Sequence, residues 1–286
     1  MQIIDGRKLQ GEILSQVKKE IATLSFVPLF CDVLVGGDPS SAQYVRMKAQ
    51  KAESVGIKFY NANFPVSITT DELIKEIKIL NKVKNMCGII VQLPLPEHLD
   101  KREILNSIDS RLDVDCLGDV TSEKFYNDYN TQTDLGYPTA LACMALLDSI
   151  DLDLDPSTPL GAGRKIVVLG QGMLVGRPVS ALLEFRGLSS VIVRSKTENK
   201  EKLIKEADII ISGMGKGKYI TGNMIKFGAI VIDAGTSESD GGIVGDVDLE
   251  SVKDVAGYVS PVPGGVGPVT VAMLLKNVLK VAKNLK

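Results

Sequence analysis

The stretch Lys165-Ile-Val-Val-Leu-Gly-Gln-Gly-Met-Leu-Val-Gly-Arg-Pro178 decides the fold of this chain. Its apolar run, residues 166–169, predicts a short strand that is buried in a parallel sheet. The glycines that follow the run at turn spacing are Gly170, Gly172 and Gly176. Residues 179–185 then predict a helix, so the stretch indicates a strand that turns sharply into a helix.

A turn of this kind can bind a phosphate. Glycine lets the backbone approach an anion closely, and the new helix offers free N–H groups and the positive end of its dipole. The spacing G-x-G-x-x-x-G is one residue looser than the usual dinucleotide fingerprint, so an ordinary strand-to-helix turn stays an alternative on the glycines alone. The expected cofactor-binding residues here are Gly170, Gln171, Gly172, Met173, Val175 and Gly176.

The end of the next predicted strand bears on the choice of cofactor. Folds that prefer NAD generally place Asp or Glu there to hold the ribose hydroxyls. This chain has Arg194, Ser195, Lys196 and Thr197 instead. Two cations and two hydroxyls suit a 2′-phosphate, which a carboxylate would repel. We therefore expect NADP, with NAD possible, and a solvated loop with chance basic residues as the alternative.

Composition excludes several classes of protein. The 286 residues are 44% hydrophobic and 24% charged, with a net charge of -2, which gives no reason to expect nucleic acid or an anionic membrane as partner. No apolar run approaches the roughly 18 residues that span a bilayer, and the first residues lack the apolar core of a secretory signal. The four cysteines have no metal-type spacing and there is one histidine, so we expect reduced thiols, a cytoplasmic location and no metal site.

Predicted strands and helices alternate along the chain, which indicates parallel sheets covered by helices. Strands are predicted at residues 29–35, 58–64, 88–93, 166–169, 191–193, 209–212, 229–233 and 257–259. Helices are predicted at residues 40–55, 70–83, 103–108, 137–150, 179–185 and 270–284. Residues 151–163, with two prolines and two glycines, read as a linker. We expect an α/β fold of two domains with parallel sheets, in which the last helix packs back on the first domain.

Four polar residues stand where a parallel sheet places its ligands. Tyr44 and Lys48 are four residues apart and so share one helix face. Gln92 ends a predicted strand, and Asp115 follows the next helix. Taken singly, each has an ordinary explanation: a surface pair, a strand-end cap and a turn residue. Together they indicate a site.

The chain resembles the bifunctional methylenetetrahydrofolate dehydrogenase/methenyltetrahydrofolate cyclohydrolases over nearly its whole length. The most specific marker is Pro261-Val-Pro-Gly-Gly-Val-Gly-Pro268 with Thr270. The other markers are Gly36-Gly-Asp-Pro-Ser-Ser-Ala-Gln-Tyr-Val45 with Lys48, Gly88-Ile-Ile-Val-Gln-Leu-Pro-Leu95, Asp113-Val-Asp115, Val175-Gly-Arg-Pro178 and Gly245-Asp-Val247.

The resemblance implies a folate-binding catalytic domain, residues 1–138 plus 267–286, and a Rossmann-like NADP-binding domain, residues 139–266. It implies a substrate cleft between them and a homodimer made through the second domain. Lys48 is the expected proton-handling residue, with Gln92 and Tyr44 as its catalytic partners. Tetrahydrofolate derivatives are the expected substrates, bound by Tyr44, Gln92, Leu93, Pro94, Asp115, Gly264, Gly265 and Val266. Thr139, Arg194 and Ser195 join the cofactor-binding set.

The chain also departs from the family pattern. Tyr137-Pro-Thr-Ala-Leu-Ala142 replaces the usual Pro-Cys-Thr-Pro and keeps only Thr139. Gln171 stands where an Arg often holds the 2′-phosphate, and Cys116 replaces a glycine after Asp115. Two alternatives therefore stay open: another two-domain NADP dehydrogenase of shikimate or amino-acid type, and a family member that binds folate or nucleotide without turnover.

Overall fold

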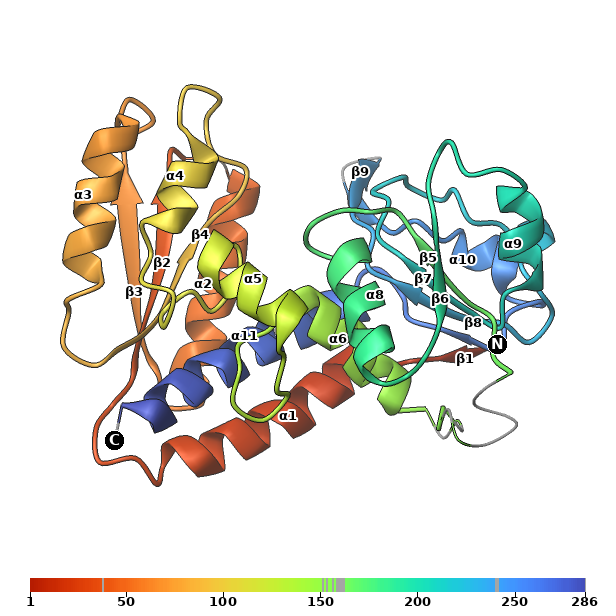
Figure 1. Cartoon of the computed structure of the whole chain (residues 1–286), viewed down its shortest axis with the longest axis horizontal. Coiled ribbons are helices and arrows are strands. Elements are labelled where there is room, and N and C mark those ends of the chain that lie inside the picture. The colour runs from red at the N-terminus through yellow and green to blue at the C-terminus, as the bar shows by residue number, and fades with distance from the viewer. Residues whose placement is uncertain are drawn as a thin grey trace. The chain divides into compact units, whose positions relative to one another are not determined.

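The computed structural model describes residues 1–37, 39–150, 152, 154–155, 157, 163–239 and 242–285, without the side chains of residues 39–41. The chain forms two compact units (Figure 1). Unit 1 consists of Met1–Gly11 and Thr139–Thr270, and unit 2 of Glu12–Pro138 and Val271–Lys286. Most of the predicted linker, residues 151–163, lies outside the described residues, as does Asp38 of the first family marker.

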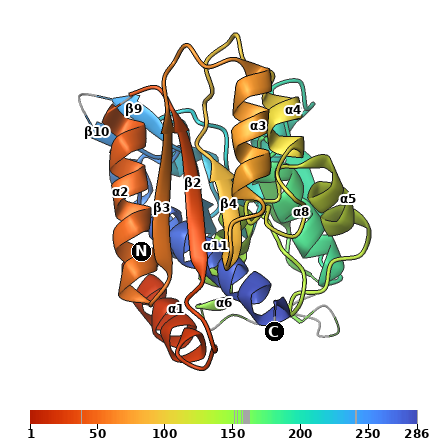
Figure 2. The same cartoon turned by 90° about the vertical axis from the view of Figure 1, so that its left-hand side faces the viewer.

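Unit 2 is built on a sheet of three parallel strands in the order β3-β2-β4 (Figure 2). The strands are β2 (Leu29–Val35), β3 (Lys58–Phe64) and β4 (Met86–Val91), and α2 (Pro39–Ser54) and α3 (Thr70–Leu80) connect them. The first two strands have the predicted bounds. Every residue of β4 is buried, as expected of a parallel strand with both faces covered.

The last helix, α11 (Val266–Asn284), packs on this sheet through its C-terminal part. A Cβ added at Gly88 would meet the Val278 side chain at 2.9 Å, so only glycine allows the helix this close to β4. Asn277 Nδ2 donates to the carbonyl oxygens of Val114 at 2.8 Å and Gly136 at 2.7 Å. The prediction that the last helix packs back on the first domain is confirmed. Helices α4 (Lys101–Asn106) and α5 (Asp119–Asn127) also belong to this unit.

Unit 1 contains a six-stranded parallel sheet in the order β1-β11-β8-β7-β5-β6. Its strands are β1 (Gln2–Ile3), β5 (Ile166–Leu169), β6 (Ser190–Val193), β7 (Ile209–Ser212), β8 (Ile230–Asp233) and β11 (Tyr258–Val259). The order reverses at β5, whose neighbours are β6 and β7. The carboxyl end of such a strand is where doubly wound sheets bind nucleotides, so the predicted Rossmann-like fold is confirmed.

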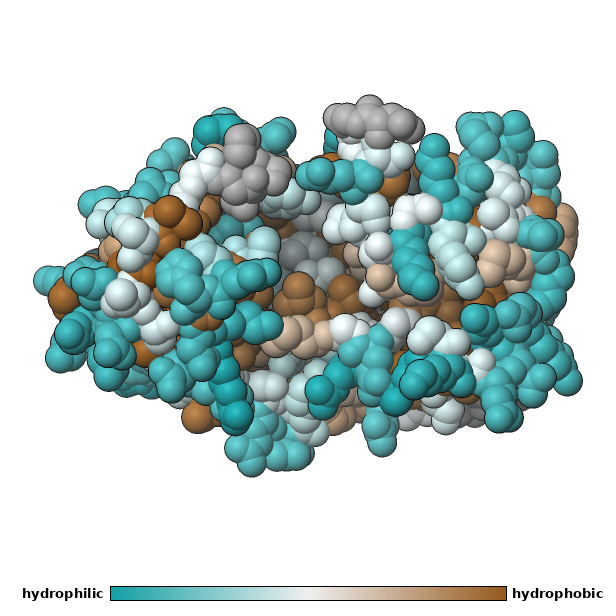
Figure 3. Space-filling view, turned by 90° about the horizontal axis from the view of Figure 1, so that it is seen from above, coloured by the Kyte–Doolittle hydropathy of each residue, from teal (hydrophilic) through white to brown (hydrophobic). Residues whose placement is uncertain are grey.

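Among its described residues, unit 1 also contains α6 (Pro138–Asp148), α8 (Gly176–Phe185), α9 (Lys200–Glu206), η1 (Gly222–Met224) and α10 (Leu249–Val252). Strand β9 (Ser237–Ser239) pairs antiparallel with β10 (Gly242–Val244). Strands β5, β7 and β8 are buried throughout. Hydrophilic side chains cover most of the face shown in Figure 3, with hydrophobic ones in smaller patches. Within the described ranges, no helix is long and apolar enough to span a membrane.

The first residues of the chain were not foreseen as structured. Strand β1 pairs with β11, with Gln2 opposite Tyr258, and α1 (Gly6–Ile21) follows. Thus residues 1–11, which the sequence analysis places in the first domain, lie in unit 1. The sequence did carry a sign of α1, because Asp is a preferred N-cap residue and Asp5 directly precedes the helix. In the structure the Asp5 carboxylate accepts from the backbone N–H of Arg7 and Lys8.

Candidate functional site

Lys48 is the most enclosed of the predicted catalytic residues. It lies on α2 and is only 7% exposed, which is unusual for lysine. Its Nζ donates to Gln92 Oε1 at 2.8 Å and lies 2.6 Å from Asp32 Oδ2. An ammonium has three hydrogens, so these two partners leave at least one for a ligand.

Asp32 is a site residue that the sequence analysis missed. It sits in the middle of β2 and is fully buried. Burial raises the pKa of its carboxyl, while the charge and hydrogen-bonding capacity of Lys48 oppose that rise. A carboxylate inside an otherwise apolar strand is rarely left unpaired, so the sequence Leu29-Phe-Cys-Asp-Val-Leu-Val35 carried a signal for a buried cationic partner.

Gln92 is held in place by the sheet itself. Its backbone N–H donates to Val33 O at 2.8 Å, which continues the pairing of β2 and β4 one residue beyond β4. Because successive side chains alternate between faces, this fixes the face on which its amide meets Lys48. Of the next residues, Leu93 is partly exposed and Pro94 is exposed, and a cis peptide bond joins them.

Asp115 lies in a loop that is wrapped around another carboxylate. Asp113 accepts from the backbone N–H of Leu117 at 3.3 Å and of Gly118 at 2.8 Å. Cys116, which precedes Leu117, has a left-handed φ of 59°. Asp115 itself remains partly exposed. Burial raises its pKa to about 7, against the lowering effect of Lys48. Its protonation state therefore changes near neutral pH.

Tyr44 lies one helical turn before Lys48 on α2 and is 38% exposed. In unit 2 the structure thus brings together Lys48, Gln92 and Asp32, with Asp115 close enough to interact electrostatically with Lys48. Tyr44 presents an aromatic surface from the same helix.

In unit 1, the predicted cofactor turn depends on glycine at two positions. Gly170 directly follows β5 and has φ +95°, and a Cβ there would meet Gly213 O at 2.9 Å. A Cβ at Gly176 would meet Gly170 O at only 2.2 Å. The turn and the start of α8 therefore touch backbone to backbone, as the close packing of a strand and helix around a phosphate requires.

The start of α8 fits an anion. Its N-cap residue, Val175, makes no side-chain hydrogen bond to the helix. The first N–H groups of a helix have no partner within the helix. Here that of Arg177 donates to Gly172 O at 3.2 Å, and no capping side chain takes another. Gln171, Gly172 and Met173 before it are exposed, while Val175 and Gly176 are buried.

Arg194 follows β6 and is exposed, in a turn closed by Thr197. Thr197 Oγ1 accepts from Arg194 N at 2.8 Å, and Thr197 N donates to Arg194 O at 3.1 Å. Ser195 and Lys196 in the turn are exposed too. Across the described ranges, no carboxylate forms an ion pair with Arg194, so its guanidinium is available to a phosphate.

The remaining predicted residues also belong to unit 1. Thr139 is partly exposed in the first turn of α6. Gly265 N donates to Pro261 O at 2.7 Å in a tight turn that precedes α11, and Gly264 has φ +112°. Val266 begins α11 and is buried. A Cβ at Gly6 would meet Gly265 O at 1.9 Å, so the start of α1 supports this turn.

A buried carboxylate network fixes the loops beyond β7 and β8. No role was predicted for its members, although Asp246 lies in the family marker Gly245-Asp-Val247. Asp246 accepts from Ser212 Oγ at 2.6 Å, Met214 N at 2.8 Å and Lys216 N at 2.6 Å. Asp233 accepts from Gly235 N at 2.9 Å and from the backbone of residues 246 and 247. Burial raises the pKa of Asp233 to about 6. These bonds hold the sheet edge at which the cofactor turn lies.

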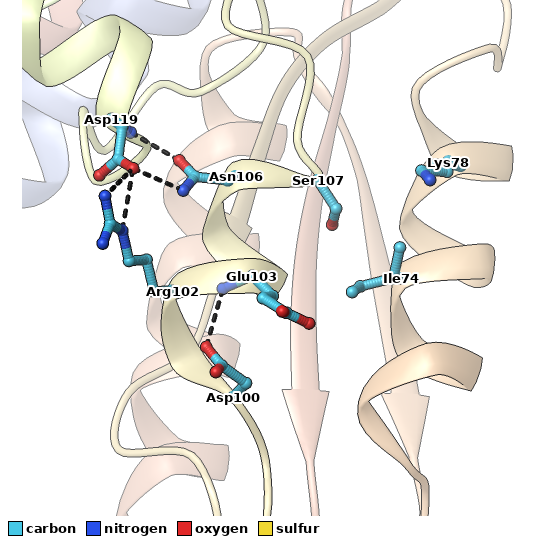
Figure 4. A pocket seen from close by; sticks show the side chains of 8 residues that line it. All are labelled: Ile74, Lys78, Asp100, Arg102, Glu103, Asn106, Ser107 and Asp119. Carbon is cyan, nitrogen blue, oxygen red and sulfur yellow. Dashed lines mark hydrogen bonds and ion pairs between the residues drawn. The ribbon is translucent and has the colours of Figure 1, made fainter.

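A cavity of about 630 Å³ between α3 and α4 contains none of the predicted residues (Figure 4). Its polar lining is largely satisfied internally, because Asp119 accepts from Arg102 at 3.0 Å and from Asn106 at 2.8 Å. We therefore do not assign it to substrate. Among the described residues, no group of three or more His, Cys, Asp or Glu side chains is arranged to hold a metal ion.

Two family models cover the two parts of the chain. Residues 4–115 match the tetrahydrofolate dehydrogenase/cyclohydrolase catalytic domain, and residues 138–286 match the NAD(P)-binding domain of the same family. A "Bifunctional protein FolD" from Nautilia profundicola is 40% identical over 288 residues, which are 99% of this chain and 98% of that protein.

Solved structures agree. The bifunctional FolD dehydrogenase/cyclohydrolase of Campylobacter jejuni superimposes with a TM-score of 0.93 at 36% identity, covering 100% of both chains. The Trypanosoma brucei FolD, complexed with NADP cofactor and inhibitor, gives a TM-score of 0.90 at 34% identity, covering 99% of this chain and 97% of that one. The folate interpretation is therefore favoured over the shikimate-type dehydrogenase and over a protein without turnover. The chain belongs to the tetrahydrofolate dehydrogenase/cyclohydrolase family.

Proposed function

We propose that this chain oxidises methylenetetrahydrofolate with NADP and hydrolyses the methenyl product to formyltetrahydrofolate, with Lys48 as the residue that moves protons in the second step. The observation that carries the proposal is the position of the Lys48 amino group. It is buried, hydrogen-bonded to Gln92 and paired with Asp32. A general acid–base group must be enclosed and oriented in this way.

The folate would be held by the polar groups around Lys48. An ionised Asp115 offers only lone pairs, which suit the N–H donors of the pterin ring. Tyr44 would stack on the folate or hydrogen-bond to it, and Leu93 and Pro94 would give apolar contact beyond Gln92. Because the pKa of Asp115 is about 7, both its protonated and its ionised forms are accessible at neutral pH. N–H donors on the pterin would favour the ionised form.

The dehydrogenase step needs placement more than proton transfer. NADP, when bound, supplies the hydride acceptor. The backbone around Gly170, Gly172 and Gly176 would bind its phosphates, and Arg194 with Ser195 would bind the 2′-phosphate. Gln171, Met173, Val175 and Thr139 complete the proposed set, and Gly264, Gly265 and Val266 would border the folate. The NADP complex of the trypanosomal relative supports this choice.

We also propose a cytoplasmic homodimer made through unit 1. Strand β6 is an edge of the six-stranded sheet, and Val191 on it is 46% exposed. An apolar side chain on an open edge suits pairing with a second copy. Light scattering during size exclusion tests this directly, and a monomer at micromolar concentration would exclude it.

An absorbance assay tests the central proposal. Methylenetetrahydrofolate is added with NADP or with NAD, and reduced cofactor is followed. Methenyltetrahydrofolate is then supplied alone, and its loss is followed. We expect both reactions in the parent protein. Folded protein that produces no reduced cofactor with either nucleotide would overturn the dehydrogenase assignment.

A further inference from the structure

Asp32 has no access to solvent, and among the described residues it forms one ion pair. Its side chain is fully buried, and Oδ2 lies 2.6 Å from Lys48 Nζ. Neither carboxylate oxygen has a hydrogen-bond partner of good geometry in the described structure. An ionised carboxylate has about four lone-pair sites and normally fills several of them when buried. Asp32 is thus poorly solvated as an anion.

The surroundings of Lys48 restrict where a proton can go. Asp32 faces it from β2, Gln92 from the end of β4, and Asp115 acts on it from the loop after α4. Tyr44 lies on the same helix. Of these four groups, the two carboxylates are the ones that can take a proton from an ammonium at neutral pH. Asp115 is partly exposed and proposed to bind folate. Asp32 has no such second task.

We propose that Asp32 is a positioning residue for the hydrolytic step: the pair holds one shared proton, and when that proton sits on Oδ1 of the carboxyl, Oδ2 still lies 2.6 Å from Nζ and the amine lone pair of Lys48 is free to accept a proton from water. The inference rests on the proposed role of Lys48. Burial raises the pKa of Asp32, which favours the arrangement in which the shared proton sits on the carboxyl. A base oriented by a third group is a recurring solution in enzymes.

The proton count of the step closes. The oxygen of water bonds to the cationic bridge carbon of methenyltetrahydrofolate as one water proton moves to Lys48 Nζ. The bond from that carbon to N5 then breaks, N5 takes the proton from Nζ, and the hydroxyl proton leaves to solvent as the carbonyl forms. The products are neutral formyltetrahydrofolate and one proton, and the pair regains its starting state.

The test is the pH profile of cyclohydrolase kcat in Asp32→Asn. The amide cannot hold the shared proton, so Lys48 becomes a base only where its own ammonium has lost a proton. We expect the acidic limb to move to higher pH by about one unit or more, and kcat at pH 7 to fall at least about tenfold. Dehydrogenase kcat should stay near that of the parent, because hydride transfer needs no base.

The direction of the shift separates the proposal from a plain charge effect. If Asp32 only stabilised the ammonium, its removal would move the limb to lower pH. A limb that moves down, or does not move, overturns the proposal. Asp32→Glu keeps the carboxyl and should restore the limb toward the parent position. Asp134→Asn is the matched control: it removes another nearly buried carboxylate of unit 2, 2.5 Å from Lys124 Nζ, and should leave the limb in place.

A second measurement applies if Asp32→Asn does not fold. Carbon-13 NMR of the aspartate carboxyl carbons in the parent protein should show one buried carboxyl, absent from Asp32→Glu, that binds a proton at higher pH than exposed aspartates do. A resonance that titrates with the exposed group overturns the proposal. Lys48→Met tests the proposed role of Lys48 separately from the inference about Asp32. If hydrolysis survives Lys48→Met, the role of Lys48 is wrong. If Lys48→Met abolishes hydrolysis but the Asp32 variants behave as the parent, only the inference about Asp32 is wrong.

Discussion

The surroundings of Lys48 in unit 2 and the turn from Gly170 to Gly176 in unit 1 are built from different parts of the chain. Around Lys48, side chains carry the chemistry: an amine, an amide and carboxylates, whose positions are fixed by strands and a helix. In the turn, the backbone itself forms the site. It is packed so closely that a Cβ at Gly176 would lie 2.2 Å from the carbonyl oxygen of Gly170. The first site should be sensitive to changes of charge at constant volume, and the second to added volume at constant charge.

The largest effect is expected from Lys48→Met, which removes the amine but keeps an unbranched stem. General acid–base groups contribute ~10²–10⁴-fold, so cyclohydrolase kcat should fall by that factor. Asp32, left without its partner, should bind a proton, since burial already raises its pKa. Hydrolysis is measured with methenyltetrahydrofolate, and thermal unfolding checks the fold. Turnover within a few-fold of the parent would reassign Lys48 to structure or binding.

Gly176→Ala should break the second site without changing any charge. The added methyl group has no room, and overpacking typically costs ~1–3 kcal/mol. We expect lower stability and a NADP dissociation constant raised at least about tenfold, measured by titration calorimetry. Gly11→Ala on α1 is the control, because a Cβ there meets nothing within 4 Å and alanine favours a helix. Equal cofactor affinity in the two variants would show that the turn does not bind the phosphates.

Asp115→Asn tests the site around Lys48 by changing charge at nearly constant volume. It should weaken folate binding and raise the stability of the protein at neutral and higher pH. The folded-state pKa of about 7 lies above the ordinary Asp value, so the native state binds more protons than the unfolded state between about pH 4 and pH 7. Stability from this group is therefore greatest at acid pH and is lost as pH rises through 7. Asp115→Asn should remove the stability loss that the parent suffers when Asp115 ionises. That loss is on the order of 2–4 kcal/mol at most, and less where solvent reaches the side chain.

The measurements for Asp115→Asn are melting curves at pH 5 and pH 8 and folate affinity at pH 8. We expect a higher melting temperature than the parent at pH 8 and a smaller difference at pH 5. Folate should bind ~10–100-fold more weakly, because a charge-assisted hydrogen bond is worth ~1.5–3 kcal/mol. Unchanged folate affinity would remove Asp115 from the anchoring role.

The same contrast explains what the sequence could predict. Strands 29–35, 166–169 and 209–212 have their predicted bounds, because they are short apolar runs buried in parallel sheets. Strand 58–64 also has its predicted bounds, although Ala62 is its only buried residue. The glycine turn was visible because its function depends on residue type at fixed spacing. Helix α1 was missed, although Asp5 and the buried Leu14, Val17 and Ile21 carry its cap and its period.

The side-chain site was harder to complete from sequence. Lys48 and Gln92 were chosen from spacing and resemblance, but the contact between them spans 44 positions. Asp32 went unnoticed because nothing local identifies its partner: the pairing exists only once α2 lies against β2. The roles of Asp233 and Asp246 were missed for the same reason. Each carboxylate accepts a hydrogen bond from a donor far along the chain, Val247 N for Asp233 and Ser212 Oγ for Asp246. Long-range polar pairing is set by the fold rather than by a motif.

The smallest effect is expected from Arg194→Ala, where the turn site does depend on a side chain. Arg194 is exposed, so solvent screens its contact with a 2′-phosphate and the change should be near the lower end of ~1.5–3 kcal/mol, or about tenfold. The KM for NADP should rise by that factor, and the KM for NAD, which lacks the phosphate, should stay near its parent value. Lys200→Ala, at the start of α9, is a nearby cationic control. Steady-state kinetics with both cofactors decides the matter: equal use of NAD and NADP by the parent would show that Arg194 and Ser195 form only a solvated turn.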